Sequence, residues 1–120
     1  MSNIADIIRD FGESRPRVVA DLHSTTFEIK YVREDVAGRY SDRDFDEAYK
    51  LIMANTVTGD EFKSLIGEGQ FNAQTLFFDD IVVFFFPSQR YEGVFASFDY
   101  DGSFPVNELV KQVSETRTES

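Results

Sequence analysis

The sequence contains no cysteine and no tryptophan, and its only histidine is His23. The lack of cysteine excludes disulfides, thiolate catalysis, iron–sulfur clusters and cysteine-based zinc sites. A histidine-based metal site is also disfavoured, because a single imidazole is available. No apolar run approaches the roughly 18 residues of a membrane span, and the N-terminus has no basic stretch followed by an apolar core. We therefore expect a cytoplasmic protein that is not associated with a membrane.

Basic residues are scarce as well. The chain has 12 Lys and Arg against 22 Asp and Glu, a formal net charge of −10, and only four of the bases are lysines. Such an acidic surface is typical of proteins from halophilic archaea, because hydrated carboxylates keep a protein soluble in high salt. It also argues against nucleic acid as a partner, since no basic patch would displace counterions. The nearest approach to a basic cluster, Arg15 and Arg17 around Pro16, is interpreted as a solvated loop.

Apolar and aromatic residues, in contrast, are plentiful. Hydrophobic residues make up 42% of the chain and aromatic residues 15%, and thirteen residues are Phe. This composition excludes a disordered chain. A chain of 120 residues also buries roughly two thirds of its unfolded surface without a disulfide or a metal. The sequence predicts a single domain over residues 1–113, followed by a frayed polar tail over residues 114–120.

The N-terminal half has the pattern of a short helix, a hairpin and a long helix. Apolar residues recur at helical spacing over 4–11, and residues 18–22 and 27–31 alternate as two strands. A capping box formed by Ser41 and Asp44 predicts the start of the long helix.

The end of this long helix is left open by its composition. The stretch that includes Gly59 is rich in poor helix formers, although the apolar spacing resumes beyond it. The helix over 42–66 is therefore either continuous to about Ile66 or broken near Gly59. Gly67 and Gly69 provide a stop signal after it.

The C-terminal half predicts three strands and a final helix. Residues 71–78 alternate, Asp79-Asp80 has the composition of a tight turn, and residues 81–86 are apolar without interruption. An apolar run of this kind must be covered on both faces of a sheet. Residues 91–98 form the last predicted strand.

The final helix and the resulting order of elements complete the predicted fold. Ser103 is expected to cap this helix and Pro105 to lie in its first turn. The fold class is then α+β: a five-stranded antiparallel sheet with helices on both faces and the order α-β-β-α-β-β-β-α.

Three segments were considered as sites for chemistry, and none has a complete set of groups. Residues 99–103 resemble the start of a calcium loop, but Val110 stands where a glutamate ligand is needed. Asp79 and Asp80 are adjacent turn residues that point to opposite sides, which does not suit an acid and base pair. His23 lies in a predicted turn without a nucleophile or orienting acid. We predict no catalytic residue, no metal and no cofactor, and an enzyme is the least favoured class.

Most of the phenylalanines are expected in the core. Stacking on nucleic-acid bases is disfavoured, because no lysine or arginine lies among the aromatic residues of the strands. Thirteen Phe is nevertheless more than a core of this size usually holds. Some of these side chains are therefore expected on an exposed patch used for association.

With this element order, the chain resembles the Roadblock type of dynein light chain, a fold that includes bacterial and archaeal regulators of small GTPases. The resemblance lies in the C-terminal half, in Gly69-Gln70-Phe71, in the segment 79–83 and in the segment 91–94 before the last helix. Members of that family often have Asn-Leu-Gly where this chain has Tyr91-Glu92-Gly93. Over nearly its whole length the chain also resembles an uncharacterised family of small acidic proteins from halophilic archaea.

The Roadblock resemblance implies a homodimer, or a dimer with a related protein, in which the third strands pair edge to edge and the second helices pack together. Carried onto this sequence, the implied interface residues are Tyr49, Met53, Phe71, Ala73, Thr75 and Phe77. The first hypothesis is a non-enzymatic scaffold or regulator that acts through dimerisation, in association with a small GTPase or a signalling partner. The alternative is a small-molecule sensor with a pocket between sheet and helix.

Overall fold

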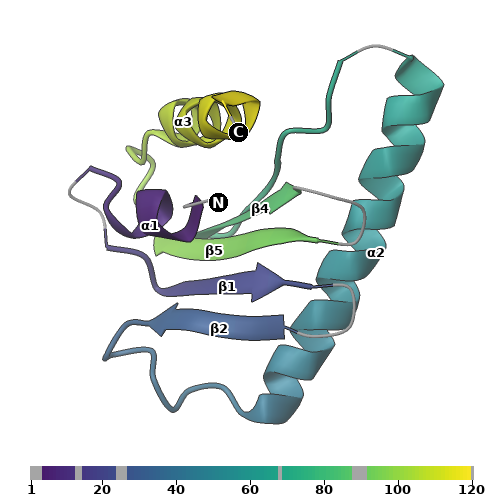
Figure 1. Ribbon diagram of the computed structural model, residues 1–120. Coiled ribbons are helices and arrows are strands. Elements are labelled where there is room, and N and C mark those ends of the chain that lie inside the picture. The colour runs from purple at the N-terminus through teal and green to yellow at the C-terminus, as the bar shows by residue number, and fades with distance from the viewer. Residues whose placement is uncertain (1–3, 13–14, 24–26, 68, 88–91, 120) are drawn as a thin grey trace.

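The computed structural model describes residues 4–12, 15–23, 27–67, 69–87 and 92–119 (Figure 1). Its elements are α1 (Ile4–Arg9), β1 (Val18–Leu22), β2 (Phe27–Val32), α2 (Asp42–Ile66), β3 (Gln74–Phe77), β4 (Ile81–Pro87), β5 (Gly93–Asp99) and α3 (Val106–Glu119). The predicted α+β class and the predicted order of helices and strands are confirmed.

The five strands form one sheet in the order β2-β1-β5-β4-β3, and every neighbouring pair is antiparallel. Strand β5 lies at the centre of the sheet, because Ala96 lies opposite Val19 on β1 and opposite Phe84 on β4. The sheet therefore ends in β2 on one side and in β3 on the other. Both of these edge strands have a neighbour on one side only.

One face of the sheet is covered by α1 and α3 (Figure 1). Alternate residues of β4 point to this face, where Phe84 and Phe86 are fully buried. Phe98 on β5 joins them, and its ring centroid lies 4.6 Å from that of Phe104, in the segment before α3. The helices contribute the buried apolar residues Ile4, Ile8, Leu109 and Val113. This face holds the larger part of the core.

The opposite face of the sheet packs against α2. Phe85 on β4 and Leu22 on β1 are buried there with Ile52 of the helix. Because Phe85 points to this face while its neighbours Phe84 and Phe86 point to the other, the strand is covered on both faces. The prediction that residues 81–86 form a strand buried on both sides is confirmed.

The α2 helix is continuous from Asp42 to Ile66, which settles the alternative that the sequence left open. The predicted capping box is present: the Ser41 hydroxyl accepts a hydrogen bond from the Asp44 amide, and the Asp44 carboxylate accepts one from the Ser41 amide. At the other end, Gly67 adopts a left-handed conformation with φ of 77° and donates its N–H to the Lys63 carbonyl. Figure 1 shows that α2 crosses the strands and extends beyond β4, towards the β3 side of the sheet.

The ring of Phe71 packs directly beside Gly59, inside this helix, so only a residue without a Cβ atom fits at position 59. A Cβ atom at position 59 would overlap that ring. The strand predicted over 71–78 is shorter than expected, because β3 comprises only Gln74–Phe77. Phe71 packs against the helix and Ala73 packs against the core on the α1 and α3 side, so neither residue extends the strand.

The final helix differs from its prediction at its start. It begins at Val106, so Pro105 precedes the helix and does not lie in its first turn. Ser103 is not the cap, because its hydroxyl and its amide both donate to the Asp101 carboxylate in a turn before the helix. The helix continues to Glu119, so it includes most of the segment 114–120 that was predicted as a frayed polar tail. None of the helices in the described residues is both long and apolar enough to cross a membrane.

Candidate interaction surface

The large apolar side chains that remain exposed come from one part of the chain. Within the described residues, all nine lie between positions 40 and 78, and none lies in β1, β4, β5, α1 or α3. They are Tyr40, Leu51, Val57, Phe62, Leu65, Ile66, Leu76, Phe77 and Phe78. Seven of the nine lie in the C-terminal half of α2 or in residues 76–78, and exposed apolar residues concentrated on few elements are a frequent sign of an association surface.

Three of these side chains follow one another at the end of the edge strand β3, where Leu76 and Phe77 lie in the strand and Phe78 directly follows it. Leu76 is 42% exposed, Phe77 56% and Phe78 57%. We call these three residues the β3 tip. The ring of Phe77 lies 5.3 Å from that of Tyr100, while much of its surface stays open to solvent. An edge strand with exposed apolar side chains can pair with a strand of another chain.

A trough lies beside this strand, between the C-terminal part of α2 and α3. Its volume is about 840 Å³, and residues 70–75 contribute to its lining. Phe62 and Ile66 line it from α2, and Val106 and Val110 from α3. We call this feature the α2–α3 trough. Its apolar walls stand next to the start of β3.

The charges around the α2–α3 trough are unlike those of the chain as a whole. No aspartate or glutamate occurs among the described residues that line it, although the chain has 22 acids. Lys63 lines it from α2 and Lys111 from α3. Within the described part of the chain neither lysine has an ion pair, whereas Lys30 pairs with Glu28 and Lys50 with Glu47. The trough is therefore a locally basic site on an acidic protein.

The structure places the six interface residues implied by the Roadblock resemblance in different surroundings. Tyr49 and Met53 are half-buried and pack on the cluster formed by Leu22, Ile52 and Phe85, so they face the sheet. Phe71 and Ala73 precede β3 and pack inward. Thr75 and Phe77 lie in β3, and of the six only Phe77 is among the exposed large apolar residues. The exposed apolar residues of α2 are thus different ones from those the resemblance indicated.

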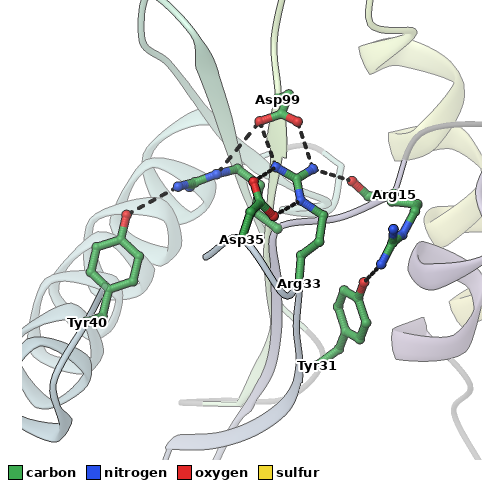
Figure 2. Close-up of polar contacts among 7 residues, drawn as sticks. Arg15, Tyr31, Arg33, Asp35, Tyr40 and Asp99 are labelled. Atoms are coloured by element: carbon green, nitrogen blue, oxygen red, sulfur yellow. Dashed lines mark hydrogen bonds and ion pairs between the residues drawn. The ribbon is translucent and has the colours of Figure 1, made fainter. Parts of the chain in front are cut away.

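A group of charged residues joins three strand ends, on the side of the sheet where β3 also ends (Figure 2). Arg33, which follows β2, donates to Asp99 at the end of β5, with Nη1 2.7 Å from Oδ2. The same guanidinium donates to Asp35. Arg17 precedes β1 and is only 6% exposed, with Nε 3.8 Å from Asp99 Oδ1 and Nη2 3.4 Å from the Tyr40 hydroxyl. The interpretation of Arg17 as part of a solvated loop is wrong, because Asp99 and the strand ends enclose it.

These contacts stabilise the charged forms of Arg33 and Asp35. Hydrogen bonds to Asp35 and Asp99 raise the pKa of Arg33 above its ordinary value. Hydrogen bonding from Arg33 lowers the pKa of Asp35 below its ordinary value of 3.8. With its two carboxylates occupied by arginines, the group has no free acid or base for catalysis. Its effect is to hold the segment that leads into α2 against the sheet.

The remaining candidate segments do not form a site for chemistry. Asp101 accepts two hydrogen bonds from Ser103, which supports the turn interpretation of residues 99–103. Asp79 and Asp80 lie in the exposed turn between β3 and β4. His23, in contrast, is not isolated: Nε2 lies 3.5 Å from Glu28 Oε1, and Asp21 is close enough for the three groups to hold an ion. The Lys30 ammonium lies 3.2 Å from Glu28 and 3.7 Å from Asp21, so a cation already lies beside both carboxylates.

Comparison with known proteins identifies a family without assigning an activity. No curated protein and no solved structure matches the chain significantly. A family described as "Domain of unknown function (DUF7522)" matches residues 2–118, which is nearly the whole sequence. The chain therefore belongs to this family.

Proposed function

We propose that this chain is a non-enzymatic protein-interaction module that acts as a dimer, held by the edge of β3 and the apolar residues exposed beside it. The observation that carries the proposal is the concentration of exposed apolar side chains on α2 and β3. A partner that covers these residues would remove apolar surface from water, at about 25 cal/mol for each Å².

The backbone of β3 supports the same proposal. As the last strand of the sheet, β3 pairs with β4 on one side and has no strand on its other side within the described residues. Pairing with a strand of another chain would satisfy its outward N–H and C=O groups and extend the sheet. The charge distribution also favours this region, because no acid lines the described part of the α2–α3 trough and two strongly acidic molecules approach most easily where acids are absent.

The proposal is tested by the molecular mass in solution. Sedimentation equilibrium at tens of micromolar is expected to give a dimer for the wild type. Leu76→Lys places a charge on the exposed face of β3 and is expected to weaken the dimer at least about tenfold, since lysine on an edge strand opposes pairing.

Ala37→Lys is the matched control for this substitution, because it also replaces an exposed apolar residue by a single positive charge. Ala37 lies in the segment between β2 and α2, is not among the nine exposed large apolar residues and does not line the α2–α3 trough. The control is expected to remain a dimer. A wild type that stays monomeric at these concentrations, or an equal loss in both variants, would overturn the proposal.

A second candidate function is a small-molecule sensor, and the α2–α3 trough is the observation that favours it. Its volume of about 840 Å³ lies in the range of roughly 300–1,000 Å³ that ligand sites occupy. Native mass spectrometry of the purified protein tests this candidate, because a retained metabolite would add a discrete mass that denaturation removes.

For the first proposal, the interaction module, the Roadblock resemblance implies a small GTPase or a signalling protein as the partner. The identity of this partner stays a prediction.

A further inference from the structure

We infer that the β3 tip of one copy of the chain docks into the α2–α3 trough of a second copy, and that the two copies do so reciprocally. This inference rests on the proposed dimerisation and adds to it the residues that recognise each other. It follows from strand geometry, apolar complementarity and charge complementarity between two surfaces of the same chain.

The geometry comes from the pairing of an edge strand with its own copy. Two identical strands related by a twofold axis pair antiparallel, so the end of one lies beside the beginning of the other. An axis through the middle of β3 sets Gln74 of one copy opposite Phe77 of the second. The β3 tip of the second copy then lies alongside residues 73–75, and these residues line the trough.

The apolar surfaces match in this arrangement. The β3 tip presents Leu76, Phe77 and Phe78, each more than two fifths exposed. The α2–α3 trough offers apolar side chains on both walls, including Phe62, 57% exposed, and Ile66, 64% exposed. A tip inserted between these walls covers exposed apolar side chains of both copies at once.

The charges match as well. Asp79 and Asp80 follow the β3 tip directly and are exposed, with no ion pair among the described residues. Lys63 and Lys111 line the α2–α3 trough and are likewise without an ion pair in that part of the chain. Docking of the tip brings the two acids towards the two lysines, once in each half of the dimer. An acidic chain thus meets its copy through its own basic site.

Charge reversal tests the inference. Variant A carries Lys63→Glu and Lys111→Glu, and variant B carries Asp79→Lys and Asp80→Lys. Each variant alone would place like charges at both contacts, so its homodimer is expected to weaken at least about tenfold at an ionic strength of about 0.15 M. In a mixture of A and B every contact again joins opposite charges, because each trough meets a tip of the other sign. The mixture is therefore expected to form an A–B dimer of nearly wild-type affinity.

Two control variants separate this contact from the effect of net charge. Lys30→Glu with Lys50→Glu changes the net charge as variant A does, and Glu34→Lys with Asp46→Lys changes it as variant B does. All four control residues are exposed and lie outside the residues that line the trough. Both controls are expected to dimerise as the wild type does, and circular dichroism checks that all variants are folded.

The outcomes distinguish this inference from the proposal it rests on. A dimeric wild type whose affinity is unchanged in A and B would overturn the inference and leave dimerisation intact. Weakening of A and B without recovery in the mixture would also overturn it. A wild type that stays monomeric would overturn both, as would a retained small molecule in the trough that competes with self-association. Recovery in the A–B mixture supports the inference.

Discussion

The two edges of the sheet differ in how they meet solvent. The β2 edge carries the exposed residues Glu28 and Lys30, and Lys30 forms ion pairs with Glu28 and with Asp21. The β3 edge has no charged residue from Gln74 to Phe78 and exposes three large apolar side chains there. Charges on an edge strand oppose pairing with another chain, and their absence permits it.

The two halves of α2 differ in a similar way. Its N-terminal half lies on the β2 side, where Phe27 contacts Phe45 and Tyr49 with ring centroids 6.3 and 6.5 Å apart. Its C-terminal half extends towards the β3 side and exposes Phe62, Leu65 and Ile66. The β2 side is thus occupied with holding the fold together, and the β3 side has apolar surface left for a partner. The comparison predicts that changes on the first side affect folding and changes on the second affect association.

The largest effect on folding is expected from Ile52→Ala. Ile52 is 7% exposed and packs between α2 and the sheet, so the substitution should lower the free energy of unfolding by about 3 kcal/mol. Leu65→Ala, in the exposed half of the same helix, should change it by less than about 0.5 kcal/mol, because Leu65 is 80% exposed. Urea denaturation at submicromolar protein measures both. Equal losses would contradict the division of α2 into two halves.

The next largest effect on the free energy of unfolding is expected at Gly59, in the C-terminal half of α2. Gly59→Ala would gain up to about 1 kcal/mol from helix propensity, but its Cβ would overlap the ring of Phe71. We expect a net loss of about 1 kcal/mol in the free energy of unfolding, since the ring has to move.

Phe71→Ala provides the control for this substitution. With the ring removed, Gly59→Ala should become stabilising by roughly 0.5–1 kcal/mol, and a double-mutant cycle would detect the change of sign. If Gly59→Ala stabilises the protein in both backgrounds, the contact between Phe71 and α2 is not as described.

An effect of similar size is expected at the start of α2. Ser41→Ala removes the hydroxyl that accepts from the Asp44 amide, so the free energy of unfolding should fall by about 1 kcal/mol. Ser103→Ala is the matched control, because the Ser103 hydroxyl donates within a turn and does not cap a helix. Thermal denaturation of both variants should therefore show the larger loss for Ser41→Ala. The opposite order would contradict the assignment of the cap.

The smallest expected effect is the pH dependence due to Asp35. Arg33 lowers the pKa of Asp35 in the folded protein below its ordinary value of 3.8. The contribution of Asp35 to stability is therefore present above that value and is lost as the pH falls through the lowered pKa. Asp35→Asn should lose less stability than the wild type between about pH 5 and about pH 2. Urea denaturation of both proteins at these pH values measures the difference. If the wild type and Asp35→Asn lose the same free energy of unfolding over this range, the Arg33–Asp35 contact is contradicted.

Local sequence signals accounted for most of the fold. The uninterrupted apolar run over 81–86 required cover on both faces, and Ser41 with Asp44 defined the start of α2, because these signals act between near neighbours. The limits of β3 and α3 depended on contacts that a local pattern does not contain. Phe71 alternates like a strand residue, yet its ring packs beside Gly59, twelve positions earlier in the chain.

The candidate site was less accessible to sequence reasoning. The Roadblock resemblance implies Tyr49 and Met53 as interface residues. Both sides of α2 carry apolar residues, and helical spacing alone does not say which side the sheet covers. The burial of Arg17 depends on strand register, since Val18 lies opposite Ser97 and this brings Arg17 near Asp99. The exposed β3 tip had a signal in the sequence, namely an apolar run beside Asp79-Asp80. This run could be interpreted as exposed only once β3 was known to lie at an edge of the sheet.

Hydrogen–deuterium exchange of the two edge strands at several protein concentrations tests the central claim most directly. If the chain dimerises through β3, the amides of Gln74–Phe77 will exchange more slowly as the concentration rises from submicromolar to tens of micromolar. The amides of Phe27–Val32 in β2 will exchange at a constant rate and serve as the internal reference. Concentration-independent exchange in β3, or protection that rises equally in both strands, would contradict the account.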